Sequence, residues 1–215
     1  MLIEVIEGLY SFMWDNNREN NCNAFLIDGS RKILIDPGHQ HLFAHVEKGL
    51  AALKIPIEKI DLVIATHAHP DHFEAVARFP DTTQFAMGYY EYELVKKFAG
   101  SYFQLPEPDF FLQEGELIIG TNQFEILETP GHSPGSVCIY WPEKRVLFAG
   151  DVIFHHGIGR TDLPGGSGKQ LKESIQRIRS LDVEYVLSGH GDVIAGKEAV
   201  QANFQEIENY WFNYI

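Results

Sequence analysis

The segment Thr66-His67-Ala68-His69-Pro70-Asp71-His72 places three imidazoles and one carboxylate within seven residues. Imidazole nitrogens and carboxylate oxygens are the protein ligands that bind Zn²⁺ and iron. The alternative interpretation is a solvated, His-rich turn that binds no metal. The density of ligand types in so short a segment favours a metal site over that alternative.

An apolar run directly before this motif indicates how its side chains are positioned. Leu62-Val63-Ile64-Ala65 is typical of a short buried strand. Residues i and i+2 of an extended segment point to the same side, so His67 and His69 can converge on one ion. Asp71 and His72 follow where the chain should turn into a helix, and they can face a second ion close by.

The remaining pattern predicts short strands alternating with helices. Helical spacing is clearest where Leu42, Val46 and Leu50 share one face. Strands are expected over residues 5–13, 23–28, 32–36, 62–65, 117–119, 124–128, 136–140, 145–148 and 185–187. Helices are expected over residues 41–53, from about 71, and over 89–98, 169–181 and 197–211. Periodicity therefore favours a mixed α and β layered domain, and no composition shift divides residues 1–215 into two domains.

Bulk properties exclude several classes of partner. The 215 residues carry a formal net charge of −13, which disfavours nucleic acid and anionic membranes. No apolar run reaches membrane-spanning length, and the first residues are acidic where a signal peptide is basic. Cys22 and Cys138 cannot build a disulfide framework, so we expect two reduced thiols in a cytoplasmic protein.

Five of the ten histidines lie outside the positions that suggest metal ligation. His39, His41 and His45 are close to the start of the expected helix 41–53, and we interpret them as part of a solvated face. His155 and His156 could approach a pocket rim, but nothing in the metal pattern requires them.

Four other segments complete a resemblance to a known family. They are Leu34-Ile35-Asp36-Pro37-Gly38, Thr129-Pro130-Gly131-His132-Ser133-Pro134-Gly135, Phe148-Ala149-Gly150-Asp151 and Ser188-Gly189-His190-Gly191. In this order, and from about residue 10 to about residue 196, the chain resembles the metallo-β-lactamase-fold superfamily of metal-dependent hydrolases. The resemblance implies an α/β (α+β) fold, a four-layer αββα sandwich, with metals held by loops at one edge.

The resemblance also assigns the ligands. It implies that His67, His69 and His132 hold a first ion. It implies that Asp71, His72 and His190 hold a second, with Asp151 bridging the two. Zn²⁺ is the expected ion, with iron or manganese as alternatives. The nucleophile would be a water or hydroxide shared by the ions, whose pKa falls towards 7 from about 15.7 in bulk water.

Two further aspartate roles follow from this assignment. Asp71 is suited to orient the nucleophilic water, so it is the candidate catalytic residue. Asp36 is a candidate partner that binds a ligand imidazole without binding the metal itself. The alternative for Asp36 is an ordinary turn aspartate.

The stretch Gly157-Ile158-Gly159-Arg160-Thr161-Asp162 narrows the resemblance. It resembles the short glyoxalase II-like (hydroxyacylglutathione hydrolase-like) enzymes and the persulfide dioxygenases, both of which act on glutathione-linked sulfur compounds. The resemblance implies that Arg160 binds a carboxylate of the glutathione moiety, a contact that a guanidinium suits. The alternative for Arg160 is a structural salt bridge with Asp162 or another acid.

The expected function is therefore metal-dependent hydrolysis of a thioester such as an acyl-glutathione. A mononuclear Fe²⁺ persulfide dioxygenase could use His67, His132 and Asp151 of the same set. A lactonase, a phosphodiesterase or a non-enzymatic metal-binding member of the fold is a further alternative. The aromatic tail at residues 210–214 either folds back or forms a homodimer contact, and the sequence leaves both open.

Overall fold

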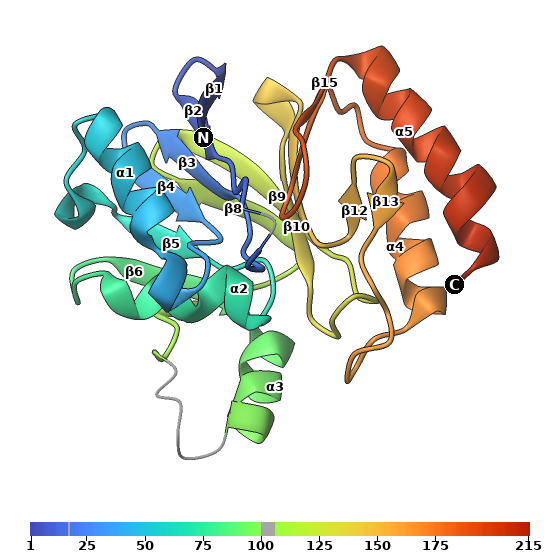
Figure 1. Ribbon diagram of the computed structural model, residues 1–215, viewed down its shortest axis with the longest axis horizontal. Helices are drawn as coiled ribbons and strands as arrows, with labels where there is room; N and C mark the ends of the chain where they lie inside the picture. The colour runs from blue at the N-terminus through green and yellow to red at the C-terminus, as the bar shows by residue number, and fades with distance from the viewer. Residues whose placement is uncertain (17, 100–105) are drawn as a thin grey trace. The chain divides into compact units, whose positions relative to one another are not determined.

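The computed structural model describes residues 1–16, 18–99 and 106–215, which form two compact units (Figure 1). Unit 1 comprises Met1–Leu112 with Ile119–Thr121, and unit 2 comprises Gln113–Ile118 with Asn122–Ile215. This division does not test the prediction of a single domain over residues 1–215.

Unit 1 is built on a seven-stranded sheet in simple sequential order. Its strands are β1 (Leu2–Ile6), β2 (Leu9–Phe12), β3 (Ala24–Asp28), β4 (Lys32–Ile35), β5 (Leu62–Ile64), β6 (Gln84–Gly88) and β7 (Phe110–Leu112). Strands β1 to β4 pair antiparallel, and β4 to β7 pair parallel. The single strand expected over residues 5–13 is wrong. Gly8 adopts φ +75 and turns the chain between β1 and β2, a conformation that glycine accepts readily.

The helices of unit 1 pack on the sheet through their apolar faces. They are η1 (Gln40–Leu42), α1 (Ala44–Ala52), η2 (Ile57–Lys59), α2 (Pro70–Phe73), η3 (Glu74–Arg78) and α3 (Tyr89–Ala99). Val46 and Leu50 of α1 join Phe12, Leu26 and Leu34 in one buried cluster. The helix expected over residues 41–53 is thus split, because a 3₁₀ turn precedes α1.

Unit 2 is built on a six-stranded sheet in the order β15-β14-β11-β10-β9-β8, with a separate two-stranded hairpin. The sheet strands are β8 (Gly115–Ile119), β9 (Asn122–Glu128), β10 (Val137–Trp141), β11 (Val146–Gly150), β14 (Tyr185–Ser188) and β15 (Ile194–Ala195). The hairpin consists of β12 (Ile153–Phe154) and β13 (Gly157–Ile158), and a 3₁₀ turn, η5 (Pro142–Lys144), joins β10 to β11. Val146, Leu147 and Phe148 are fully buried, as the sequence pattern of a central strand predicts.

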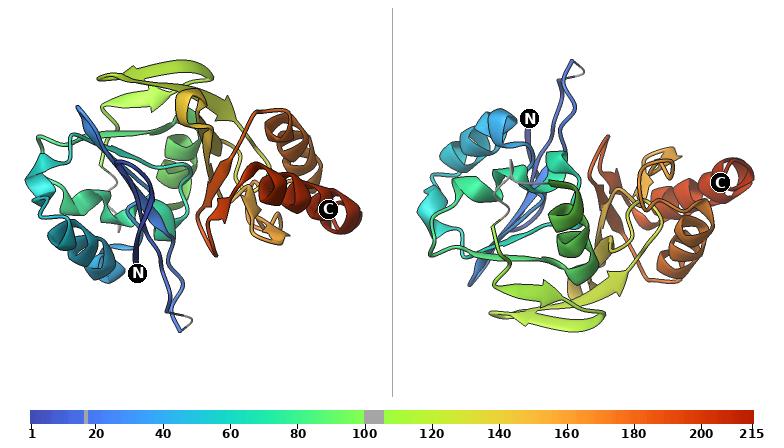
Figure 2. Two further views of the ribbon diagram at one scale, coloured as in Figure 1. Left: turned by 90° about the horizontal axis from the view of Figure 1, so that it is seen from above. Right: turned by 90° about the horizontal axis from the view of Figure 1, so that it is seen from below.

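Two amphipathic helices complete unit 2. They are α4 (Gly168–Arg179) and α5 (Lys197–Tyr210), followed by η6 (Trp211–Asn213). They lie side by side in Figures 1 and 2 and bury Ile175, Ile178, Phe204 and Ile207 in one cluster. Both helices begin and end within two residues of the expected bounds.

Parallel pairing brings the chemistry-bearing loops together within each unit. In unit 1, Asp36 and the His67 motif follow β4 and β5, which are parallel neighbours. In unit 2, Asp151 follows β11 and His190 follows β14, which are also parallel neighbours. Because parallel strands end at the same edge of a sheet, loops distant in sequence meet there. None of the helices that the structure describes is both long and apolar enough to cross a membrane.

Candidate metal centre

Four of the seven predicted ligands belong to unit 1 and three belong to unit 2. In unit 1, Nε2 of His67 lies 3.1 Å from Nδ1 of His69. Two ligands of one ion, with bonds of about 2.1 Å, lie about 3.0–3.4 Å apart. The two imidazoles that share the motif therefore stand at the spacing of a common ion.

Asp36 determines which ring nitrogen His67 and His72 can offer to a metal ion. Its carboxylate accepts hydrogen bonds from the Thr66 backbone N–H at 2.8 Å and from the Thr66 hydroxyl at 2.8 Å. It also lies 3.0 Å from Nδ1 of His72. Since Thr66 gives its proton to Asp36, its Oγ1 is left to accept from Nδ1 of His67, 3.1 Å away. Nδ1 then carries the proton in His67 and His72, and Nε2 offers its lone pair.

Asp36 is also a strained residue. It is 1 % exposed and has φ +53, a left-handed conformation that costs a non-glycine residue on the order of 1 kcal/mol. Its contacts with Thr66 and His72 go beyond those of an ordinary turn aspartate. Its role in supporting a metal ligand stays a prediction.

Asp71 and His72 lie in the single turn of α2, which Pro70 opens at its first position. Asp71 is buried, and its Oδ2 accepts a 2.6 Å hydrogen bond from the side-chain amide of Asn20. Sequence reasoning missed Asn20, because a lone asparagine in a loop carries no motif.

Glu91 is a second supporting residue that sequence reasoning missed. It lies on α3, is fully buried, and its Oε2 accepts the backbone N–H of Ala68 at 2.8 Å. Ala68 separates His67 from His69, so this bond fixes the backbone that carries both imidazoles. The available signal was an acid one helical turn before the apolar Val95, on the buried face of the helix.

In unit 2 two of the three predicted ligands lie near one carboxylate oxygen of the third, Asp151. Oδ2 of Asp151 lies 3.5 Å from Nε2 of His132 and 3.4 Å from Nε2 of His190. These separations exceed an ordinary hydrogen bond and approach the spacing of ligands around a shared ion. Both imidazoles thus lie near the same oxygen of Asp151, whose role as a bridging ligand stays a prediction.

The backbone after the β12–β13 hairpin orients His132. Nδ1 of His132 donates to the backbone carbonyl of Arg160 at 2.8 Å, which leaves Nε2 as the ligand nitrogen. Gly159 permits this approach, because a Cβ there would lie 1.8 Å from the Asp151 carbonyl oxygen and 3.0 Å from Nδ1 of His132. The sequence gives no sign that the backbone of Arg160 has this task.

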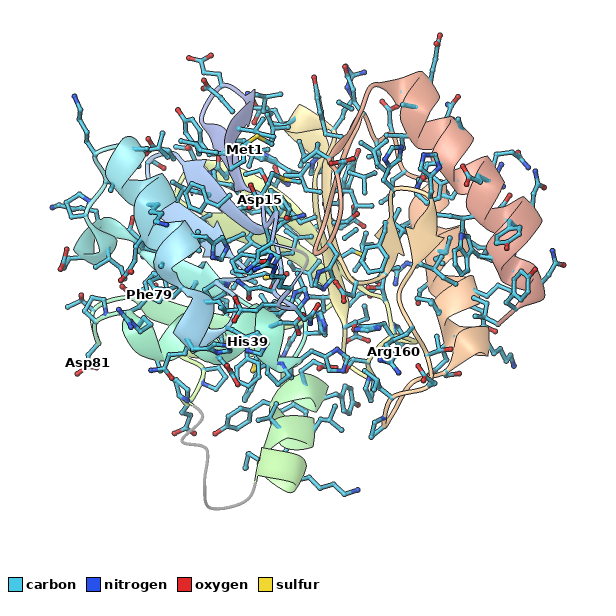
Figure 3. All side chains as sticks on the ribbon, viewed as in Figure 1. Met1, Asp15, His39, Phe79, Asp81 and Arg160 are labelled. Carbon is cyan, nitrogen blue, oxygen red and sulfur yellow. The ribbon has the colours of Figure 1, made fainter. Side chains whose placement is uncertain are left out.

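The Arg160 side chain forms the salt bridge that we considered as its alternative role. Its Nε and Nη2 each donate to Asp162 at 2.7 Å, on the exposed loop after β13 where Figure 3 labels Arg160. The guanidinium holds the pKa of Asp162 down to about 2. Substrate binding by Arg160 stays a prediction.

The donor set fits a divalent metal. Three imidazoles donate from Nδ1 to an acceptor, which places the lone pair on Nε2, and two buried aspartates supply carboxylate oxygens. This is the ligand chemistry of zinc, iron and manganese sites.

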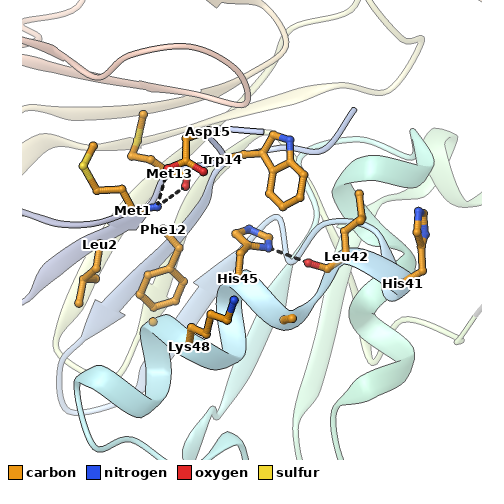
Figure 4. A pocket seen from close by; sticks show the side chains of 12 residues that line it. Met1, Leu2, Phe12, Met13, Trp14, Asp15, His41, Leu42, His45 and Lys48 are labelled. Carbon is orange, nitrogen blue, oxygen red and sulfur yellow. Dashed lines mark hydrogen bonds and ion pairs between the residues drawn. The ribbon is translucent and has the colours of Figure 1, made fainter. Parts of the chain in front are cut away.

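The other histidines contact different partners. His156 pairs with Glu206 at 2.6 Å, and His155 lies 3.9 Å from Asp192, both at the surface of unit 2. His45 lines a pocket of about 450 Å³ in unit 1 together with Phe12, Trp14 and Lys48 (Figure 4).

The interpretation of His45 as part of a solvated face is wrong. Its ring packs edge-on against Trp14, and Nδ1 donates to the Leu42 carbonyl at 3.0 Å. Burial lowers the pKa of His45.

Comparison with known proteins identifies the family. Residues 17–190 match the Metallo-beta-lactamase superfamily. A hydroxyacylglutathione hydrolase of Francisella tularensis subsp. novicida is 31% identical over 172 residues, covering 78% of this chain and 61% of that enzyme. The chain thus spans less than two thirds of that relative. A hydroxyacylglutathione hydrolase of Haemophilus influenzae is 32% identical over 191 residues, covering 80% of this chain and 86% of that enzyme.

A solved structure shows the same fold. A metallo-β-lactamase family protein of Thermus thermophilus aligns with a TM-score of 0.80 at 20% identity, covering 97% of this chain and 80% of that one. The expected mixed α/β fold of metallo-β-lactamase type is confirmed. The chain belongs to the metallo-β-lactamase superfamily.

Proposed function

We propose that this protein is a dinuclear metallohydrolase that cleaves a thioester, with an acyl-glutathione as the substrate class. The observation that carries the proposal is the set of imidazoles whose Nδ1 atoms are held by Asp36, Thr66 and the Arg160 carbonyl. Such fixed tautomers are typical of metal ligands. The family, and the two relatives named hydroxyacylglutathione hydrolase, support the reaction class.

The proposed ligands form two groups that share Asp151. His67, His69 and His132 would hold one ion, and Asp71, His72 and His190 the other. Zn²⁺ is the proposed ion, with iron or manganese as alternatives. When bound, the pair of ions supplies an acidified water and polarises the thioester carbonyl.

Asp71 and Arg160 have the remaining roles in this proposal. Asn20 donates a hydrogen bond to Oδ2 of Asp71, and the Asp71 carboxylate held in this way would orient the attacking water. Arg160 would exchange its exposed partner Asp162 for a carboxylate of the substrate, since an exposed ion pair is weak. Cys22 and Cys138 are buried and form no disulfide, which suits the reducing cytoplasm, the proposed compartment.

Metal content and two assays test the proposal together. Untagged protein purified without added metal is expected to hold about two ions per chain by elemental mass spectrometry. It is expected to hydrolyse an acyl-glutathione, and a chelator should abolish this activity. About one iron per chain, with oxygen uptake on glutathione persulfide and no thioesterase activity, would instead establish the mononuclear dioxygenase.

A further inference from the structure

A cluster of three metal-ligating side chains lies in unit 1 and uses none of the seven predicted ligands. His39, His41 and Glu74 each offer one donor atom within 4.8 Å of the donor atoms of the other two. Nδ1 of His39 lies 2.7 Å from Oε2 of Glu74, and the rings of His39 and His41 have centroids 4.9 Å apart. We call these three residues the His39 cluster.

The backbone that carries the His39 cluster is fixed by hydrogen bonds. The N–H of His39 donates to the side-chain oxygen of Asn21 at 2.8 Å. Next to Glu74, the N–H of Ala75 donates to the carbonyl of Gly38 at 2.8 Å. The His39 and Glu74 side chains are therefore held close together before any ion binds, which reduces the cost of ordering them.

Burial and charge also suit a cation. His39 and Glu74 are 18% and 23% exposed at their side chains, while His41 is exposed and leaves the cluster open to solvent. Two neutral imidazoles and one carboxylate give the cluster a charge of −1, in a chain whose formal net charge is −13. Water can complete the coordination of an ion held by three protein ligands.

We propose that the His39 cluster is a further site for a divalent transition metal, of the two-histidine, one-glutamate type that binds Zn²⁺. The ion takes the place of the proton shared by His39 and Glu74. With bonds of about 2.1 Å, the ligand atoms lie about 3.0–3.4 Å apart, so the side chains need only small rotations.

Occupancy of this site links two segments of the predicted metal centre. His39 follows the Asp36 turn, and Glu74 follows His72 by two residues. Asp36 and His72 are themselves hydrogen-bonded at 3.0 Å. An ion in the His39 cluster, which contains none of the seven predicted ligands, is therefore expected to stabilise the contact of Asp36 with His72.

Zinc titration of four proteins tests the proposal. Untagged wild type, H41A, E74Q and the control H155A are first stripped of metal with a chelator and desalted, and are then titrated with Zn²⁺ by isothermal calorimetry. Wild type and H155A should bind one equivalent of Zn²⁺ more than H41A and E74Q. If the variants still bind this equivalent, their affinity should be at least about tenfold lower, because losing even the hydrogen-bond partner of a ligand lowers metal affinity by that factor. His155 is a matched control because it is also an exposed histidine beside a second histidine.

Thermal melting gives an independent readout. Excess Zn²⁺ should raise the melting temperature of wild type and H155A more than that of H41A, while the proteins without added zinc melt alike. Equal stoichiometry and affinity in wild type, H41A and E74Q would overturn the site. The equivalents that remain in H41A report the predicted main centre, so failure of either site is distinguishable from failure of the other.

Discussion

Asp36 combines backbone strain with three side-chain hydrogen bonds, so substitution of its carboxylate gives a direct test at the scale of one residue. In D36N the amide can accept from Thr66 but cannot also accept from Nδ1 of His72. Metal affinity is expected to fall about 10- to 100-fold, the usual cost of losing the partner of a ligand. Competition with a chromophoric chelator measures this loss. The control is D28N on β3, and equal affinities in both variants would contradict the role of Asp36.

Gly159 gives a second residue-scale prediction with a matched control two residues away. G159A places a Cβ 1.8 Å from the Asp151 carbonyl oxygen, so Asp151 or His132 must move and metal affinity should fall. In G157A the nearest atom is a Phe154 carbon at 3.7 Å, an ordinary contact, and affinity should hold. Equal metal content in the two purified variants would show that the close approach at Gly159 is not needed.

At the scale of elements, α3 supports the metal motif through one buried acid. E91A removes the acceptor of the Ala68 N–H and should cost about 1–3 kcal/mol of unfolding free energy. E93A, on the exposed face of the same helix, breaks an exposed pair with Lys96 and should cost less than about 1 kcal/mol. Urea denaturation of both variants measures the difference, and comparable losses would refute the support role of Glu91.

Helix α1 contributes a pH dependence through His45. Burial, the largest cause, lowers the folded-state pKa of His45, aided by the terminal amine and opposed by the Leu42 carbonyl and Asp15. The unfolded state therefore binds more protons below its ordinary pKa of about 6.5, so stability is lost as pH falls through that region.

The measurement is the free energy of unfolding between about pH 5 and 7, around the ordinary histidine pKa. Replacing His45 by Asn should flatten its slope against pH, whereas H155N at an exposed position should not. A slope that is unchanged in H45N would assign the pH dependence to other groups.

The elements that the sequence predicted are those whose own residues determine them. The apolar run after Asp61 forms β5, and the helical spacing within 169–181 forms α4. Strand β6 was missed because Gln84-Phe85-Ala86-Met87-Gly88 lacks β-branched residues. It is extended because it pairs with β5 on one side and β7 on the other.

The candidate site divides in the same way. A dense motif of imidazoles and carboxylates indicates metal ligation, so the ligand types could be predicted from the sequence. Asn20 and Glu91 could not, because an amide or an acid serves many purposes and only its contacts in the fold distinguish them. A backbone carbonyl such as that of Arg160 leaves no mark in the sequence.

For the whole molecule, metal removal is the decisive perturbation of stability. Under the proposed function the folded chain binds its ions and the unfolded chain does not, so the protein should lose stability in a chelator. An ion present at 1,000 times its dissociation constant stabilises the folded state by about 4 kcal/mol. Calorimetric melting with EDTA and after zinc is restored measures the effect. Identical melting temperatures would contradict a bound metal centre.

The main chain and the side chain of Arg160 make unrelated contacts. Its main chain holds His132, while its guanidinium sits on the surface with Asp162 as partner. A substitution at this position can therefore change the exposed side chain while keeping the backbone carbonyl that orients the His132 imidazole. Under the proposed function, natural selection or a saturation library at codon 160 can change substrate contacts here while keeping the backbone that orients His132.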